Sequence, residues 1–248
     1  MATAQQLDIR PPVLPFEVGL EIQGYVLINY PLPPERLAPH LPPGLVPALT
    51  TLDGQATAWF SVFLGRNVVR TIGGWRAFPL EFNLVNYRTY VEGPEGRRLF
   101  IFRSLMGPQL LAVGARLLPQ LPADPHPFYF APRIVDDRLL ALEAEVGEAA
   151  HELRVVVETM DDAPWTPGFE TPEAAVNFLG NVREGLFPLP DGRAGQMFTS
   201  HPPLAPEGGR LLEARFDWPR WHQILTSPEL RRPASVFMQG RVDFPTRM

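Results

Sequence analysis

The chain has 248 residues, of which 45% are hydrophobic and 20% charged, and its formal net charge is −5 at pH 7. Such a composition is typical of a soluble globular protein with enough chain to bury a sizeable core. The negative balance and the absence of an arginine-rich tract argue against nucleic acid as a partner. No secretory signal and no apolar run near the roughly 18 residues of a membrane helix is present, so we expect a cytoplasmic protein that does not enter membranes.

Two residue types are missing altogether. Cysteine is absent, which excludes disulfides, thiolate metal sites and a cysteine nucleophile. All 22 basic residues are arginine, as codon bias in a GC-rich genome would produce. Without lysine, no side chain can form a Schiff base, anchor pyridoxal phosphate or complete a P-loop.

The first half of the chain reads as an extended N-terminal arm over about 1–17, followed by strands and one short helix. Alternating apolar residues predict strands at about 18–30, 56–64, 79–91 and 99–105. On the first strand, strict alternation places these residues on one face: Leu20, Ile22, Val26, Ile28 and Tyr30. The segment 32–45 predicts a short, proline-bounded helix.

The second half begins with the clearest helix, 107–118, and continues into a proline-rich stretch, 119–133, expected to be a loop. A second helix is predicted at 171–182, with Thr171 as N-cap and Pro172 as its first residue. A short helix is expected at 218–225. Strands are predicted at about 138–146, 151–160, 194–200, 209–216 and 234–244.

Most predicted strands follow one another directly, which favours an antiparallel meander over a βαβ fold. We therefore expect one mainly β domain over 1–248, with a sheet closed into a barrel and a few short helices. No Gly-x-Gly-x-x-Gly fingerprint is present, so a dinucleotide is not expected. The five histidines are scattered and Gly-x-Ser-x-Gly is absent, so we expect no metal centre, no cofactor and no serine-hydrolase triad.

The strand at 79–91, PLEFNLVNYRTYV, carries polar residues at both odd-numbered and even-numbered positions. Strict alternation cannot place all its apolar residues on one face, whereas a β-bulge near Leu84–Asn86 would. With that bulge, one face would collect Glu81, Asn83, Asn86, Arg88 and Tyr90. That polar face would meet either water or a cavity inside the barrel.

The same residues resemble a known family. NYRTYV at 86–91, LFIFRSL at 99–105 and LLAVGARLLPQLP at 110–122 resemble a widespread, uncharacterised bacterial family sometimes called YqjF-like. The resemblance spans roughly residues 18–245 and is most specific in the central segment. It implies a fold similar to acetoacetate decarboxylase, whose sheet wraps into a cone around a buried pocket, and it favours the cavity over water for the polar face.

The resemblance also maps pocket positions onto this chain. The acidic pocket residue of the decarboxylase falls at Glu81, and its second buried glutamate falls near Ser61. The lysines of the decarboxylase fall near Ala123 and Asp124, so its nucleophile is missing here. Members of the YqjF-like family usually carry a glutamate just before the Asn-x-Arg-Thr-Tyr run, where this chain has Leu84.

Two interpretations stay open. In the first, the protein is an enzyme of the lyase or isomerase type, and Glu81 and Arg88 are catalytic. Glu81 would transfer a proton, Arg88 and Arg103 would hold a carboxylate, and Asn83, Asn86 and Tyr90 would bind substrate. In the second, the protein only binds an acidic small molecule, or has kept the fold for a structural role. A homo-oligomer is compatible with both interpretations, although the sequence does not reveal a subunit interface.

Overall fold

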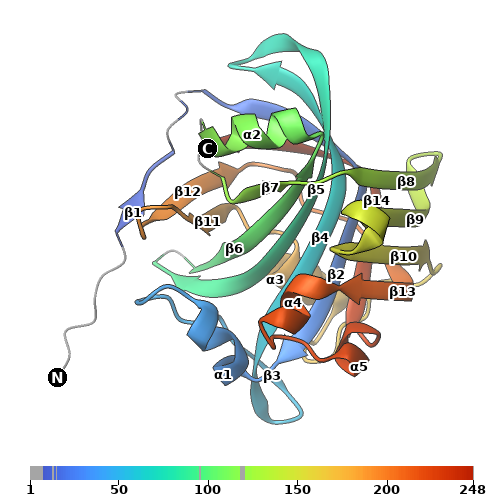
Figure 1. Cartoon of the computed structure of the whole chain (residues 1–248). Helices are drawn as coiled ribbons and strands as arrows, with labels where there is room; N and C mark the ends of the chain where they lie inside the picture. The colour runs from blue at the N-terminus through green and yellow to red at the C-terminus, as the bar shows by residue number, and fades with distance from the viewer. Residues whose placement is uncertain (1–7, 13, 15, 95, 118–120, 248) are drawn as a thin grey trace.

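A computed structural model describes residues 8–12, 14, 16–94, 96–117 and 121–247. Its centre is a sheet that curls into a ring (Figure 1). We call these seven strands the ring: β2 (Val18–Leu32), β4 (Gln55–Ile72), β5 (Trp75–Gly93), β6 (Gly96–Gly107), β11 (Glu184–Pro188), β12 (Ala194–Thr199) and β14 (Ser235–Arg247). The ring closes because β12 pairs with both β11 and β14, the latter through Phe198 opposite Arg247 and Thr199 opposite Thr246.

Four further strands extend the sheet from β14 and form a second layer, which we call the wing: β13 (Glu207–Phe216), β10 (Leu153–Thr159), β9 (Arg138–Val146) and β8 (Phe128–Val135). The wing packs against the outer face of the ring, where Val85 and Tyr87 of β5 share one buried cluster with Leu142 and Val155. Outward-facing residues of the ring are therefore buried as firmly as many inward-facing ones.

The remaining elements are short. They are β1 (Ile9–Arg10), β3 (Thr50–Leu52), β7 (Ala123–Pro125), α1 (Pro34–Leu37), α2 (Gln109–Leu117), α3 (Pro172–Leu179), α4 (Asp217–Trp221), α5 (Ser227–Leu230) and 3₁₀ turns at Ala38–His40 and Glu148–Ala150. Helix α2 lies across one end of the ring (Figure 1). Helix α3 packs its buried residues against inner-face residues of the ring such as Tyr25 and Tyr90.

The mainly β fold predicted from the sequence is confirmed, with one modification: the sheet is mixed. Strand β6 runs parallel to both β11 and β7, and β1 runs parallel to β12. Helix α3 begins as predicted, because the Thr171 hydroxyl accepts a hydrogen bond from the Ala174 amide at 3.1 Å and Pro172 follows as the first residue.

The proline-rich stretch 119–133 is not a loop throughout, and that prediction is wrong for its described part. Residues 123–125 form β7, and β8 begins at Phe128; residues 119 and 120 lie outside the described part. The prolines are tolerated because β8 is an edge strand of the sheet, where Pro132 need not donate to a second neighbour.

The first ring strand also differs from its prediction, because its apolar residues do not share one face. Leu20 and Ile22 face the inside of the ring, whereas Ile28 and Tyr30 face the wing. The change of face occurs at a bulge, where Gly24 and Tyr25 together oppose one residue of β4. Gly24 has φ of +65°, and a Cβ there would lie 2.9 Å from Pro132 of the wing, so this position requires glycine.

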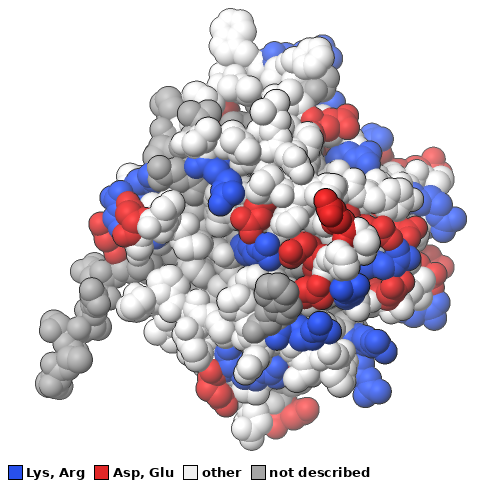
Figure 2. All heavy atoms as spheres, viewed as in Figure 1, with Lys and Arg blue, Asp and Glu red and all other residues white. Residues whose placement is uncertain are grey.

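Charged side chains gather over the wing, as Figure 2 shows. Arg154 is surrounded there by Glu143, Glu145 and Glu213. Because acidic and basic residues pair closely on this face, it carries little net field for a charged partner. Among the described helices, none is long and apolar enough to span a membrane.

Candidate functional site

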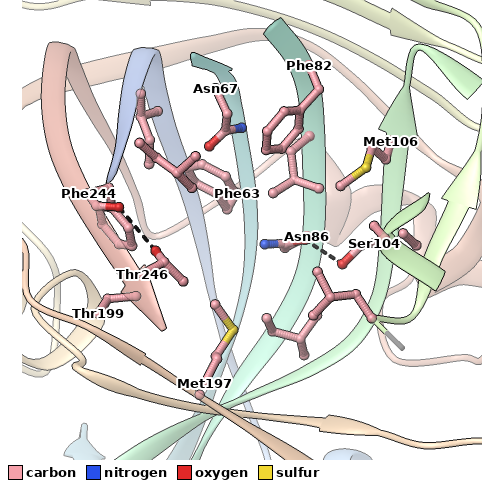
Figure 3. A pocket seen from close by; sticks show the side chains of 18 of the residues that line it. Phe63, Asn67, Phe82, Asn86, Ser104, Met106, Met197, Thr199, Phe244 and Thr246 are labelled. Atoms are coloured by element: carbon pink, nitrogen blue, oxygen red, sulfur yellow. Dashed lines mark hydrogen bonds between the residues drawn. The ribbon is translucent and has the colours of Figure 1, made fainter. Parts of the chain in front are cut away.

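The ring encloses a cavity of about 340 Å³, which we call the central cavity (Figure 3). This volume lies within the range of small-molecule pockets, at its lower end. Most side chains of its wall are apolar. The polar ones are Tyr25, Asn67, Asn86, Arg88, Ser104, Thr199 and Thr246. Among the described residues that line the cavity, Arg88 alone carries a charge.

Strand β5 presents its even-numbered residues to the central cavity. Its pairing with β4 runs without interruption from Leu80 opposite Val69 to Thr89 opposite Phe60. Side chains therefore alternate strictly along this segment. Leu80, Phe82, Leu84, Asn86 and Arg88 all line the cavity.

The predicted bulge near Leu84–Asn86 is therefore wrong. The polar residues of β5 are divided between two faces because both faces are occupied, the inner one by the cavity and the outer one by the wing. The irregularity lies instead in β6, where one extra residue, Phe102, is inserted opposite the Tyr87–Arg88 step.

This alternation separates the residues proposed for the site. Asn86 and Arg88 line the cavity. Glu81 is exposed on the outer face, and Asn83 lies on the same face beside Arg66. Arg103, opposite Tyr87, also faces outward and forms ion pairs with Asp124 at 2.5 Å and Glu152 at 3.2 Å. Glu81, Asn83 and Arg103 therefore do not belong to the cavity.

Arg88 is buried, with 7% of its surface exposed. Its Nη2 donates to the carbonyl oxygen of Leu179, the last residue of α3, at 3.3 Å, and its guanidinium carbon lies 5.6 Å from the centre of the Phe63 ring. Its Nε is buried without a hydrogen-bond partner. Within the described part of the chain, Arg88 forms no ion pair with a carboxylate.

Tyr25 stands beside Arg88 on the cavity wall. Burial raises the pKa of its hydroxyl, and the positive charge of Arg88 opposes that rise. Its hydroxyl oxygen is buried within reach of the Arg88 guanidinium, which also opposes the rise of the pKa by hydrogen bonding, although the two groups do not form a hydrogen bond of ordinary geometry. The cavity thus holds a neutral phenol and an arginine Nε, both with unused hydrogen-bonding capacity.

Tyr90 lies directly beyond Arg88 on β5 and is fully buried. Its hydroxyl donates to Leu179 O at 2.7 Å and contacts Ser61 Oγ at 2.9 Å. Ser61 in turn donates to Asn29 Oδ1 at 2.7 Å. Tyr90, which was predicted to bind substrate, therefore belongs to a hydrogen-bonded network that supports the closed end of the cavity.

Asn86 and Ser104 form a second polar point halfway along the wall. Ser104 Oγ donates to Asn86 Oδ1 at 2.6 Å across the β5–β6 pair. The amide nitrogen of Asn86 points into the cavity in Figure 3. This arrangement leaves a donor facing any ligand that lies along the wall.

His201 lies behind the wall, stacked on the cavity residue Phe244 with 4.4 Å between ring centres. Its Nδ1 contacts the Pro202 carbonyl at 2.7 Å. Burial lowers its pKa, and the nearby charges of Arg88 and Arg183 act in the same direction. A neutral histidine adds no second positive charge beside Arg88.

Sequence reasoning missed Tyr25 and the residues of β14 and α2. Tyr25 could have been found from Gly24, since a glycine inside a strand pattern signals a bulge. Phe244 and Thr246 carried no such signal, because the ring closes by contacts between distant strands. Within the described residues, no group of three His, Asp or Glu side chains is placed to hold a metal ion.

Solved structures of other proteins define the class of fold. The enduracididine biosynthesis enzyme MppR with HEPES buffer bound is similar, with a TM-score of 0.57 at 11% identity over 95% of this chain and 87% of that one. Acetoacetate decarboxylase from Legionella pneumophila subsp. pneumophila str. Philadelphia 1 gives 0.51 at 13% identity, over 100% and 90%. MppR complexed with pyruvate gives 0.50 at 14% identity, over 94% and 89%. The fold is thus of the acetoacetate decarboxylase-like class.

The sequence itself matches the DUF2071 family, described as "Uncharacterized conserved protein (COG2071)", over residues 20–228. The chain belongs to this family, and the resemblance seen in its central motifs is confirmed. No curated protein shows significant sequence similarity to it.

Proposed function

We propose that the central cavity binds a small organic acid, with the carboxylate on Arg88 and the apolar body against the surrounding wall. The observation that carries this proposal is the buried charge of Arg88, which has no carboxylate partner in the described part of the chain. The remaining described lining is neutral and mostly apolar.

The physical argument is the cost of burying a charge. An ionised group taken out of water is strongly unfavourable unless a counter-charge compensates it. Arginine stays protonated under such conditions, and its fork geometry suits a carboxylate. The unused Nε of Arg88 can donate one of two hydrogen bonds to such a ligand.

A second acceptor on the ligand would find donors nearby. The Tyr25 hydroxyl lies beside Arg88 without a hydrogen bond of ordinary geometry to any described residue, and the Asn86 amide nitrogen points into the cavity. A 2-oxo or 3-oxo acid offers such an acceptor in its carbonyl oxygen. The similarly folded MppR has been solved in complex with pyruvate, which supports an oxo acid as a ligand for this class of cavity.

Lyase or isomerase chemistry is the second candidate, and Tyr25 is the observation that favours it. Glu81 is exposed outside the ring and does not reach the cavity, so it does not serve as the acid or base there. Tyr25 is the titratable hydroxyl on the described wall, and Arg88 beside it would stabilise an enolate. The absence of lysine leaves no side chain that could form a Schiff base, and Ala123 forms part of the wall where the decarboxylase lysines map.

The test compares ligand-induced stabilisation in matched variants. Pyruvate, acetoacetate and benzoate, with their methyl esters as neutral controls, would be titrated against wild type, Arg88→Met and Arg76→Met. Arg76 lies on the same strand but is exposed. We expect the acids to raise Tm in wild type and Arg76→Met only, since a ligand stabilises the state that binds it. An equal shift in Arg88→Met would contradict the proposal.

A further inference from the structure

The wall of the central cavity becomes more deeply buried from its open end toward the charged residue Arg88. Along the inner face of β5, the exposed fraction falls from 41% at Leu80 to 8% at Asn86 and 7% at Arg88. Arg88 lies six positions after Phe82, which corresponds to roughly 20 Å along an extended strand. The charged group therefore lies at the deep end of an elongated cavity.

The outer half of the cavity is apolar on the strand and helix that meet there. We define it by Leu80, Phe82 and Leu84 of β5 and by Leu111, Gly114 and Ala115 of α2. Phe82, Leu84 and Ala115 pack around a buried cluster that contains Met106, Ala112 and Ala123. Asn67, paired with Phe82, is polar, but its amide nitrogen donates to the Gly65 carbonyl oxygen at 3.3 Å.

Gly114 leaves empty space in the outer half of the cavity, because it has no side chain. A Cβ built at Gly114 would meet no atom of the described residues within 4 Å, although Gly114 lines the cavity. Its position in the middle of α2 favours any residue other than glycine or proline for helix stability. The space beside it is therefore a feature that a side chain could fill without disturbing the helix.

We propose that the ligand is an amphiphilic monocarboxylate, an acid with a long aliphatic tail, bound with its head on Arg88 and its tail along the outer half. This inference rests on the proposed function and specifies its ligand class. A very short acid would occupy only the surroundings of Arg88 and leave the apolar outer wall against water. Each methylene placed on that wall would instead gain hydrophobic free energy.

The head-inward orientation follows from the placement of charge. A carboxylate in the outer half would lose its water without meeting a counter-charge, because that half contains no charged residue among the described ones. At the deep end, Arg88 and Tyr25 provide donors for the carboxylate oxygens. The tail then extends toward Leu80 and α2.

The experiment measures the affinity of straight-chain acids from acetate through butyrate, hexanoate, octanoate and decanoate to dodecanoate by calorimetry. Wild type, Gly114→Leu, Val113→Leu and Arg88→Met are compared. Val113 is the matched control, since it neighbours Gly114 on α2 but is exposed. In wild type we expect affinity to rise about three- to fourfold per methylene until the tail fills the cavity.

Gly114→Leu should shift the optimum to a shorter chain and weaken the longest acids at least tenfold, while butyrate binds unchanged. Val113→Leu should follow wild type, and Arg88→Met should lose the short and long acids alike. Affinity that does not increase with chain length, or long acids unaffected by Gly114→Leu, would overturn the tail assignment. In that case Arg88-dependent binding of pyruvate would still stand as the proposed function. If no acid bound in an Arg88-dependent way, both the tail assignment and the proposed function would be refuted.

Discussion

Tyr90 and Arg88 share one acceptor, the carbonyl oxygen of Leu179 at the end of α3. Tyr90 Oη lies 2.7 Å from that oxygen and Arg88 Nη2 lies 3.3 Å from it. The shorter bond satisfies the carbonyl without the arginine. Arg88 is thus held next to the helix end, where the backbone dipole favours a cation, yet no carboxylate of the described residues balances its charge.

Replacing Arg88 by methionine should therefore leave the free protein as stable as wild type or make it more stable. Leu179 O keeps its bond to Tyr90, and a costly buried charge is removed. We expect the free energy of unfolding to stay within about 1 kcal/mol of wild type or to increase, which corresponds to a Tm change of about 2–4 °C per kcal/mol. Denaturant unfolding without ligand measures this. A loss of about 3 kcal/mol or more would mean that Arg88 has a structural counter-charge.

Two tyrosines on the inner face should respond differently when their hydroxyls are removed. Tyr90→Phe removes a donor to Leu179 and a contact with Ser61, both fully buried. It should lower the free energy of unfolding by about 1–3 kcal/mol. Tyr25→Phe removes a hydroxyl whose contact with the Arg88 guanidinium is not a hydrogen bond of ordinary geometry, so stability should change by less than about 0.5 kcal/mol or increase. Equal destabilisation by the two substitutions, measured by thermal and denaturant unfolding, would refute this distinction.

Acid stability should depend on Glu229, which caps α5 and binds Arg36. Its carboxylate oxygens accept hydrogen bonds from Arg36 at 2.7 and 3.0 Å and from the Thr226 amide at 2.6 Å. The Arg36 guanidinium is the main cause that lowers the pKa of Glu229 to about 2, from an ordinary value of 4.5. Because the folded-state pKa is depressed, the stabilisation is complete above about pH 4.5 and disappears as the pH falls toward 2.

The measurement compares the free energy of unfolding of wild type and Glu229→Gln between these pH values. The difference should be constant above about pH 4.5 and should shrink below it. Since the side chain is partly exposed, the ion pair itself should contribute about 1 kcal/mol or less. A difference that does not change with pH would show that the carboxylate is not preferentially stabilised in the folded state.

The sequence was sufficient to predict the fold class and two residues of the cavity wall. Short strands that follow one another indicate a meander, and Asn86 and Arg88 share a strand parity. The alternation of residues along β5 could not show whether the odd-numbered or the even-numbered side chains face the cavity, because the wing buries Val85 and Tyr87 on the opposite face. With both faces buried, an apolar pattern no longer marks one side as the inside.

The strand whose apolar side chains change from one face to the other is β2, and the cause is a contact between distant parts of the chain. Gly24 permits the bulge, and Pro132 of the wing approaches within 2.9 Å of where its Cβ would be. Glycine within a strand signals such an approach. The sequence alone does not show that Pro132 belongs to a strand at all, because local preference there indicates a loop.

Trapping with borohydride should separate this protein from a Schiff-base enzyme. In imine formation, a neutral amine attacks the ketone carbon of acetoacetate, water leaves, and hydride from borohydride then reduces the C=N bond to a stable secondary amine. With no lysine in the chain, we expect mass spectrometry to find no adduct on any internal peptide of the wild type. An internal adduct would overturn the exclusion of this chemistry.

Ala123→Lys provides the positive control, because Ala123 lines the central cavity. The apolar wall and the charge of Arg88 in the same cavity should depress the pKa of the introduced amine and keep a neutral fraction available for attack. Arg76→Lys places a lysine on the exposed part of β5, where the amine stays protonated at neutral pH. Labelling of Ala123→Lys well above Arg76→Lys would show that the cavity admits and orients a keto acid, whereas equal labelling would argue that acetoacetate does not enter it.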